Sequence, residues 1–323
     1  LKKKVPHGAE ILFGPKGLIR VATDEKTDII VSSIVGAAGI EPTIAALKKG
    51  KRIALANKEV LVAAGEYMSQ HFHKQLLENI IPVDSEHSAI AQSLRGEEKK
   101  SMEKIILTAS GGPFLNTPRE DFRHITPAMA LAHPNWNMGN KITVDSATMM
   151  NKGLEVIEAR WLFNVEPKNI QILIHPESII HSMVQFLDGS IIGQMNVADM
   201  RIPIQFALSY PERIANEFPR VDFPRLRTFH FFEPDFEKFP LIKIAYECLE
   251  KGNIFPAVMN AANEVAVENF LKSKITFDKI SVLIKDILLS FKEVKNLTLE
   301  KILDADRRAR SEAKNWLDKN RCS

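Results

Sequence analysis

Two acidic residues, Asp84 and Glu86, lie two positions apart in a stretch that favours extended backbone. Residues two apart on a strand point to the same face, so both carboxylates would lie on one side. Together with Glu155 they would form a set of hard oxygen ligands that suits Mg²⁺ or Mn²⁺ and leaves positions for water or substrate. The alternative interpretation is a strand end that enters a polar loop, with both carboxylates in solvent.

A second stretch is predicted to be a helix that begins at Ser146, which follows the β-prone residues 141–144 and is a favourable N-cap. One face of this helix is apolar, because its hydrophobic residues recur at helical spacing: Met150, Leu154, Ile157 and Trp161. Helix starts favour anions, and Ser146, Asn151 and Lys152 add a hydroxyl, an amide and an ammonium group, which suits a phosphate monoester. The alternative is a capped amphipathic helix with a Lys152–Glu155 surface pair.

The composition is ordinary for a soluble globular protein, and the 323 residues predict two or three domains. A net charge of +3, with scattered Lys and Arg, argues against nucleic-acid binding. No apolar run approaches the roughly 18 residues that a membrane span needs. The basic residues 2–4 lack the hydrophobic stretch of a signal peptide. Two cysteines, Cys248 and Cys322, fit a reducing cytosol, so we expect a cytoplasmic protein.

Residues 1–81 have the pattern of an α/β fold with a parallel sheet. The apolar run 28–35 ends in glycines at 36–39 and is typical of a buried parallel strand. A helix over 42–49, with Gly50 as its C-cap, and a strand over 52–56 follow. Polar residues after that second strand lie where open α/β sheets bind ligands: Asn57, Lys58 and Glu59.

Residues 82–209 are predicted to form a second α/β domain. A strand over 104–108 leads into a glycine turn at 109–113, where Ser110 adds a hydroxyl to exposed backbone N–H groups. Residues 133–141 have loop chemistry but carry Trp136, which favours either a flap that closes over the site or a packed anchor.

Further along this domain, strands are predicted over 170–174, 178–186 and 190–195, with a hairpin at Asp188-Gly189. We interpret His175 and His181 as hydrogen-bonded strand residues rather than metal ligands.

Residues 210–240 carry five prolines and seven phenylalanines, which predicts a stiff linker held against a surface by its aromatic rings. Apolar periodicity over 241–251, 256–272, 276–291 and 299–319 then predicts a C-terminal α-helical bundle.

Long blocks in these regions resemble the 1-deoxy-D-xylulose 5-phosphate reductoisomerase family, and the resemblance covers essentially the whole chain. The blocks are IVGAAGIEPT (34–43), ALANKEVLVAAGE (54–66), PVDSEHSAI (82–90), LTASGGPF (107–114), HPNWNMGNKITVDSATMMNKGLEVIEARWLF (133–163), HPESIIHSMVQFLDGSIIGQM (175–195) and NAANEVAV (260–267). One departure concerns the Gly-Ser-x-Gly-Ser-Ile-Gly turn with which the family holds the NADPH phosphates. The nearest stretch, residues 13–17, lacks that spacing, so the chain is expected to begin partway through a dinucleotide-binding domain.

The resemblance implies a metal- and NADPH-dependent enzyme that isomerises 1-deoxy-D-xylulose 5-phosphate and reduces the resulting aldehyde to 2-C-methyl-D-erythritol 4-phosphate, for isoprenoid precursors. The metal would be Mg, Mn or Co. It also implies a homodimer and a domain order: residues 1–81 as the remainder of a Rossmann-like NADPH-binding domain, 82–209 as the catalytic and dimerisation domain with the flap 133–141, 210–240 as the linker and 241–323 as the bundle. The alternative is a truncated form that binds sugar phosphate and metal without reductase activity.

The resemblance also assigns residues, which we group by role. The implied metal ligands are Asp84, Glu86 and Glu155. The implied phosphate ligands are Ser110, Ser146, Asn151 and Lys152. Further substrate contacts are implied for Lys58, Ser85, His133 and Trp136. Residues near NADPH would be Ser33, Gly36, Asn57, Glu59, Gly139 and Met200. The catalytic group would be Lys58, Asp84, Glu86, Glu155 and His133.

Overall fold

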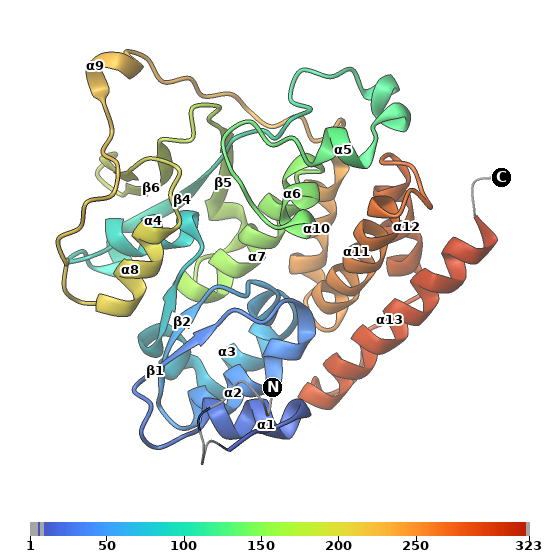
Figure 1. Ribbon diagram of the computed structural model, residues 1–323, viewed down its shortest axis with the longest axis horizontal. Helices are drawn as coiled ribbons and strands as arrows, with labels where there is room; N and C mark the ends of the chain where they lie inside the picture. Colours follow the sequence, from blue (N-terminus) through green and yellow to red (C-terminus); the bar gives the residue numbers. More distant parts are fainter. Residues whose placement is uncertain (1–5, 7–9, 321–323) are drawn as a thin grey trace.

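The structure, a computed structural model, describes residue 6 and residues 10–320 (Figure 1). The expectations for residues 2–4 and for Cys322 lie outside this part of the chain. The described residues are an α/β protein with two separate sheets and a C-terminal group of helices, as the sequence predicted. None of the helices described is both long and apolar enough to cross a membrane.

The first sheet is fully parallel, in the order β1-β2-β3. Its strands are β1 (Ile29–Ser32), β2 (Arg52–Leu55) and β3 (Ile80–Pro82). Its helices are α1 (Gly14–Ala22), α2 (Ile40–Lys48) and α3 (Glu59–Asn79). Strand β1 is shorter than the predicted 28–35, and it is not buried as predicted, because it is the edge of the sheet and leaves Val31 52% exposed. A 3₁₀ turn occupies Gly36–Gly39 before α2. Gly50 follows α2 with φ +68°, the left-handed conformation expected of a C-cap glycine.

The second sheet has the order β5-β4-β6-β7 and mixes parallel and antiparallel pairs. Its strands are β4 (Met102–Ala109), β5 (Ile170–Ile174), β6 (Ile180–Phe186) and β7 (Ile191–Met195). Strand β5 pairs in parallel with β4, whereas β6 and β7 form the predicted antiparallel hairpin. Gly189 in that hairpin has φ +84°, which glycine adopts without strain.

The predicted strand over residues 141–144 is wrong, because these residues belong to helix α6 (Asn140–Ala147). Ser146 therefore lies inside α6 and does not cap the next helix, α7 (Met150–Phe163). The break between the two helices falls at Met149, which has φ +61°. Thr143 and Val144 are β-branched, but both are buried in the helix, so tertiary packing outweighs their local preference.

Helix α7 runs through the centre of the molecule, packed between α3 and the bundle helix α10 (Pro240–Lys251). Two glycines permit this close approach. A Cβ atom on Gly65 of α3 would lie 2.1 Å from Trp161 on α7, and one on Gly153 of α7 would lie 2.6 Å from Ala245. Most of the apolar core is continuous across these helices, so α7 is fixed within it between α3 and α10.

The remaining elements surround this centre. They are α4 (Ser85–Ser93), α5 (Pro127–Ala130), α8 (Arg201–Ser209), the short α9 (Phe223–Leu226), α11 (Phe255–Leu271), α12 (Lys279–Leu289) and α13 (Leu299–Lys319). In Figure 1 the linker, yellow to orange, contains α9 and leads from α8 to α10. Its rings are not all held against a surface as predicted: Phe239 is buried, but Phe223 is 53% and Phe232 51% exposed. A single bridge pairs Phe232 with Ile174 of β5.

Candidate active site

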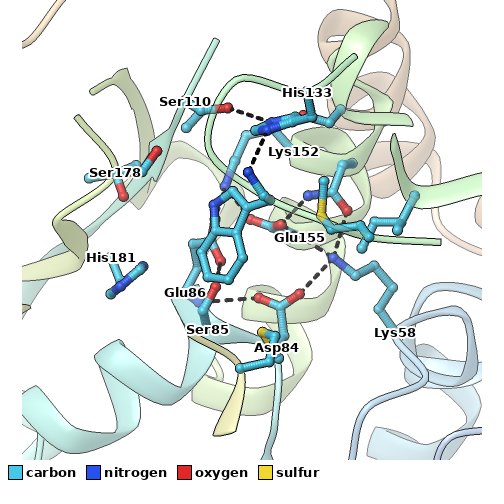
Figure 2. Close-up of a pocket in the computed structure, with 18 of the residues that line it drawn as sticks. Lys58, Asp84, Ser85, Glu86, Ser110, His133, Lys152, Glu155, Ser178 and His181 are labelled. Carbon is cyan, nitrogen blue, oxygen red and sulfur yellow. Dashed lines mark hydrogen bonds and ion pairs between the residues drawn. The ribbon is translucent and has the colours of Figure 1, made fainter. Parts of the chain in front are cut away.

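A cavity of about 290 Å³ lies where the ends of β3 and β4, the loop over residues 133–139 and the start of α7 meet. Most of the predicted site residues line it: Lys58, Asp84, Ser85, Glu86, Ser110, His133, Trp136, Ser146, Asn151, Lys152 and Glu155. Figure 2 shows Ser110, Ser178 and His181 on one side of this cavity and Lys58 on the other. Residues more than 90 positions apart in the sequence therefore converge on one space, as the hydrogen bond of Lys58 to Asn151 also shows.

Oxygen atoms of Asp84, Glu86 and Glu155 all lie within 4.8 Å of one another, a donor set that fits a hard divalent cation. The local reason for this convergence differs from the predicted one. Asp84 is the N-cap of α4 and accepts a hydrogen bond from the Glu86 backbone N at 3.2 Å. Both carboxylates are thus placed by a helix start rather than by one face of an extended strand, and the expectation of extended backbone was wrong.

Two lysine ammonium groups lie among these carboxylates. Lys58 Nζ is 2.7 Å from Asp84 Oδ2 and 3.2 Å from Glu155 Oε1. Lys152 Nζ is 2.8 Å from Glu86 Oε1 and also bonds to Glu155. Burial opposes the charged form of each lysine, but the neighbouring carboxylates outweigh it and raise both pKa values. Two positive groups facing three carboxylates leave an excess of negative charge, which favours a bound cation.

The pKa values of two of these carboxylates, Glu155 and Asp84, shift in opposite directions. Burial raises the pKa of Glu155, and the nearby Glu86 raises it further. Burial acts in the same direction on Asp84, but there Lys58 and His87 outweigh it and hold the pKa well below its usual value. Asp84 is therefore ionised at neutral pH, as a metal ligand must be.

Behind the cavity, His87 on α4 forms a second buried cluster with Asp84 and Glu158. Its Nε2 lies 2.9 Å from the backbone oxygen of Glu155, and its Nδ1 lies 3.2 Å from both Asp84 Oδ1 and Glu158 Oε2. Burial would lower the pKa of His87, but Glu158 and Asp84 raise it to about 9. Burial raises the pKa of Glu158 to about 7. Sequence reasoning missed His87, because its partners Glu155 and Glu158 lie on a different helix, α7.

At the other end of the cavity, His133 joins two serine hydroxyls. Its Nε2 lies 3.1 Å from both Ser110 Oγ and Ser146 Oγ. Its Nδ1 accepts hydrogen bonds from the backbone N atoms of Asn135 and Trp136, so the ring proton lies on Nε2. Burial lowers the pKa of His133, which keeps the ring neutral near pH 7. Donors and hydroxyls at this end suit an anionic group of a substrate.

Asn151 and Lys152 lie with the carboxylates rather than with these serines. Asn151 Nδ2 donates to Glu155 Oε1 at 2.5 Å, and Asn151 Oδ1 accepts from Lys58 at 2.7 Å. Both side chains still line the cavity.

The loop over residues 133–139 covers one side of the cavity and contacts the second sheet. The Trp136 ring lies 5.9 Å from the His181 ring, and Asn135 Nδ2 bonds to Ser178 Oγ at 3.1 Å. Ser178 and His181 both line the cavity. Sequence reasoning did not include Ser178 and assigned His181 only a structural role, because spacing along the strand could not show that this face meets the loop.

A second cavity of about 400 Å³ lies next to the first and includes four of the residues predicted near NADPH: Ser33, Asn57, Glu59 and Gly139. Lys58 and Asn151 line both cavities, so a group bound in one would lie beside a group bound in the other. Asn57 donates to the backbone oxygen of Gly36 at 3.0 Å, and its buried Oδ1 has no hydrogen-bond partner among the described residues. An unpaired buried acceptor at this point fits a ligand donor. Met200 lines the first cavity instead.

Comparisons with known proteins identify the family that this architecture resembles. Family models match residues 1–65 (1-deoxy-D-xylulose 5-phosphate reductoisomerase), 80–163 (1-deoxy-D-xylulose 5-phosphate reductoisomerase C-terminal domain) and 195–312 (DXP reductoisomerase C-terminal domain). A relative named 1-deoxy-D-xylulose 5-phosphate reductoisomerase from Clostridium perfringens is 49% identical over 93% of this chain and 78% of its own length. A relative of the same name from Pelodictyon phaeoclathratiforme is 50% identical over 96% and 81%.

Solved structures give the same result. The reductoisomerase of Zymomonas mobilis in complex with NADPH superposes with a TM-score of 0.87 at 42% identity, covering 95% of this chain and 79% of that one. A DOX-P reductoisomerase in complex with NADPH, fosmidomycin and magnesium superposes with a TM-score of 0.86 at 40% identity, covering 94% and 79%.

Proposed function

Because the chain belongs to the 1-deoxy-D-xylulose 5-phosphate reductoisomerase family, we propose that its two adjoining cavities rearrange 1-deoxy-D-xylulose 5-phosphate and reduce the product to 2-C-methyl-D-erythritol 4-phosphate. The observation that carries this proposal is the wall that the two cavities share at Lys58 and Asn151. It would bring a sugar phosphate beside the carboxylates within reach of a nicotinamide in the second cavity. Relatives bind NADPH and magnesium, and the donor sets here fit both.

Asp84, Glu86 and Glu155 would hold the divalent metal: Mg, Mn or Co. When bound, the metal would act as a Lewis acid on neighbouring substrate oxygens, and NADPH would supply a hydride. Lys58 would place a positive charge beside those oxygens, where negative charge shifts during rearrangement. Its short contact with Asp84 keeps this ammonium group pointed into the cavity.

The phosphate of the substrate would bind at the opposite end, to Ser110, Ser146 and the Nε2–H group of His133, with Asn151 and Lys152 on its inner side. Binding energy from this remote group would orient the reacting carbons. Trp136 would cover the substrate and exclude water. Ser178 and His181, which line the same wall, would complete the covering surface.

The proposal is tested by incubating the protein with 1-deoxy-D-xylulose 5-phosphate, NADPH and Mg²⁺ or Mn²⁺, and following NADPH oxidation and the product mass. We expect one NADPH consumed per product formed, and no turnover in the presence of a chelator. Binding of the sugar phosphate without NADPH oxidation, with either metal, would instead support a form that only binds sugar phosphate and metal.

We also propose that the protein is a cytoplasmic homodimer that pairs through β7. This strand is the edge of its sheet and exposes apolar side chains, among them Ile191 (51%), Ile192 (39%) and Met195 (41%). Unpaired apolar edges favour association with another chain. The buried free thiol of Cys248 is consistent with a reducing compartment.

A further inference from the structure

Lys141 connects the end of the flap to the edge of the second cavity. It is the second residue of α6, directly after the loop over residues 133–139 that carries His133 and Trp136. Its Nζ lies 2.8 Å from Glu59 Oε1 on α3 and 2.8 Å from Asp145 Oδ2 on α6. The lysine side chain is 23% exposed, and the Glu59 and Asp145 side chains are 9% and 1% exposed. All three residues line the second cavity.

The contacts of Lys141 continue into the C-terminal bundle. Asp145 Oδ1 accepts a hydrogen bond of 2.8 Å from Asn263, a fully buried residue of α11. One turn of α6 is thus tied to the bundle on one side and to the start of α3 on the other. Helix α6 cannot shift without breaking one of these contacts, so the flap is attached to a fixed base.

Lys141 is also connected to the substrate cavity, through its ion pair with Glu59. Glu59 directly follows Lys58, whose ammonium group contacts Asp84 and Glu155. Movement of Glu59 would therefore change the position of Lys58 relative to the carboxylates. Lys141 is the link between the flap, the second cavity and the carboxylate cluster.

On the basis of the proposed function, we propose that Lys141 is a positioning residue for the reduction step. Its ammonium group fixes the position of the flap relative to the cofactor cavity and to Lys58. Lys141 itself touches neither reacting carbon nor metal ligand. Its effect is carried by Glu59 on α3 and Asp145 on α6, whose carboxylates it bridges.

The charges around Lys141 favour permanent ion pairs with Glu59 and Asp145. Burial opposes the charged form of Lys141, but Asp145 and Glu59 outweigh it and raise its pKa. Burial favours the protonated form of Glu59, but Lys141 outweighs it and lowers the pKa of that carboxyl. The remaining charged neighbours are Lys58, which also lowers the pKa of Glu59 but less than Lys141 does, and Glu264 on α11, whose own partner is Arg310 at 2.8 Å. Lys141 thus faces two carboxylates that have no comparable second cation, so its loss would leave them without compensation.

The test compares Lys141→Met, which keeps the length and removes the charge, with Lys141→Arg, which keeps the charge. For Lys141→Met we expect a ~10–100-fold lower kcat and a higher KM for NADPH, because small displacements of groups around a reacting centre have effects of this size. Lys141→Arg is expected to recover most of kcat. The matched control is Arg160→Met, which removes a side chain of 21% exposure from an ion pair with Glu166 far from both cavities.

A second measurement does not depend on turnover. Trp136 fluorescence is followed while fosmidomycin and Mg²⁺ are added, and the Trp136→Phe variant identifies the part of the signal that comes from the flap. We expect Lys141→Met to need at least about tenfold more fosmidomycin for half of the change. If Lys141→Met does not fold, Lys141→Gln replaces it in both measurements, with the same expectation.

Unchanged kinetic constants and an unchanged fluorescence midpoint in a folded Lys141→Met variant would overturn the positioning role, even if the melting temperature falls. That outcome leaves the proposed function intact, because the wild-type protein would still turn over. A wild-type protein with neither turnover nor a fosmidomycin response would overturn both proposals.

Discussion

His87 and Glu155 join two helices at the proposed metal-binding cluster: Nε2 of the histidine on α4 donates to the backbone oxygen of the glutamate on α7 across 2.9 Å. The other ring nitrogen faces Asp84 and Glu158. Two of the three predicted metal ligands, which come from different helices, are therefore held by one imidazole ring. A protonated ring can donate a hydrogen bond from each nitrogen: from Nε2 to the backbone carbonyl and from Nδ1 to a carboxylate.

This arrangement predicts that stability falls with rising pH. The folded-state pKa of His87, about 9, lies above its ordinary value of 6.5. The stabilisation is therefore fully present below pH 6.5 and is lost as pH rises through about 9; its upper bound is about 3 kcal/mol. Glu158, with a pKa raised to about 7, acts in the same direction between its ordinary value of 4.5 and pH 7.

The measurement is urea unfolding at pH 6.5 and pH 9 in the presence of a chelator. We expect the wild-type protein to lose stability over this interval and His87→Gln to lose much less. The exposed histidine variant His73→Gln serves as the control and should follow the wild type. If the free energy of unfolding falls equally between pH 6.5 and pH 9 in all three proteins, the pH dependence comes from groups other than His87.

Glu155→Gln is expected to abolish turnover and leave the fold intact. The neutral amide keeps the volume but is a poor ligand for Mg²⁺ or Mn²⁺. Changes outside the ligand set commonly weaken metal binding by ~10–100-fold, so loss of a ligand should weaken it by about 100-fold or more. Mn²⁺ titration measures this, with circular dichroism as the test of folding and Glu166→Gln, an exposed glutamate on the loop after α7, as the control. Near-normal activity at saturating metal would exclude Glu155 as a ligand.

Lys152→Ala is expected to raise KM for the phosphorylated substrate by at least about tenfold, because a charge-assisted hydrogen bond contributes roughly 1.5–3 kcal/mol. In the structure the same ammonium group also holds Glu86 and Glu155, so the apparent metal affinity should fall as well. Steady-state kinetics at several metal concentrations separate the two effects. Lys104→Ala, on β4 and bonded to Gln171, is the control. A lower melting temperature with unchanged KM would show that Lys152 has a structural role only.

Ile192→Lys on β7 is expected to shift the proposed homodimer toward monomers, because it places a charge on the apolar edge where the sheets would pair. Sedimentation velocity over a range of protein concentrations measures this. Leu289→Lys is the control, since Leu289 is 76% exposed on α12, away from the second sheet. Monomeric wild-type protein at all concentrations would contradict the dimer itself.

The strands of both sheets could be predicted from the sequence, because a buried parallel strand is a continuous apolar run and a hairpin is marked by its turn residues. The Asp188-Gly189 turn is an example, whereas the run before Gly36 forms the parallel strand β1 but is not buried, since β1 is an edge strand and Val31 is 52% exposed. Asp84, Glu86 and Glu155 could be selected for their chemistry, and the structure brings them within 4.8 Å of one another. These features depend on local composition or on residue type, which the sequence contains directly.

Residues 141–144 could not be predicted in this way. Their β-branched side chains favour a strand, yet burial against the rest of the molecule makes them helical, and local preference is weaker than such packing. The same is true of His87, Ser178 and His181. Each acquires its place in the site only when a second element, distant in the sequence, is packed against its own, because hydrogen bonds and cavities of this kind exist between elements and not within them.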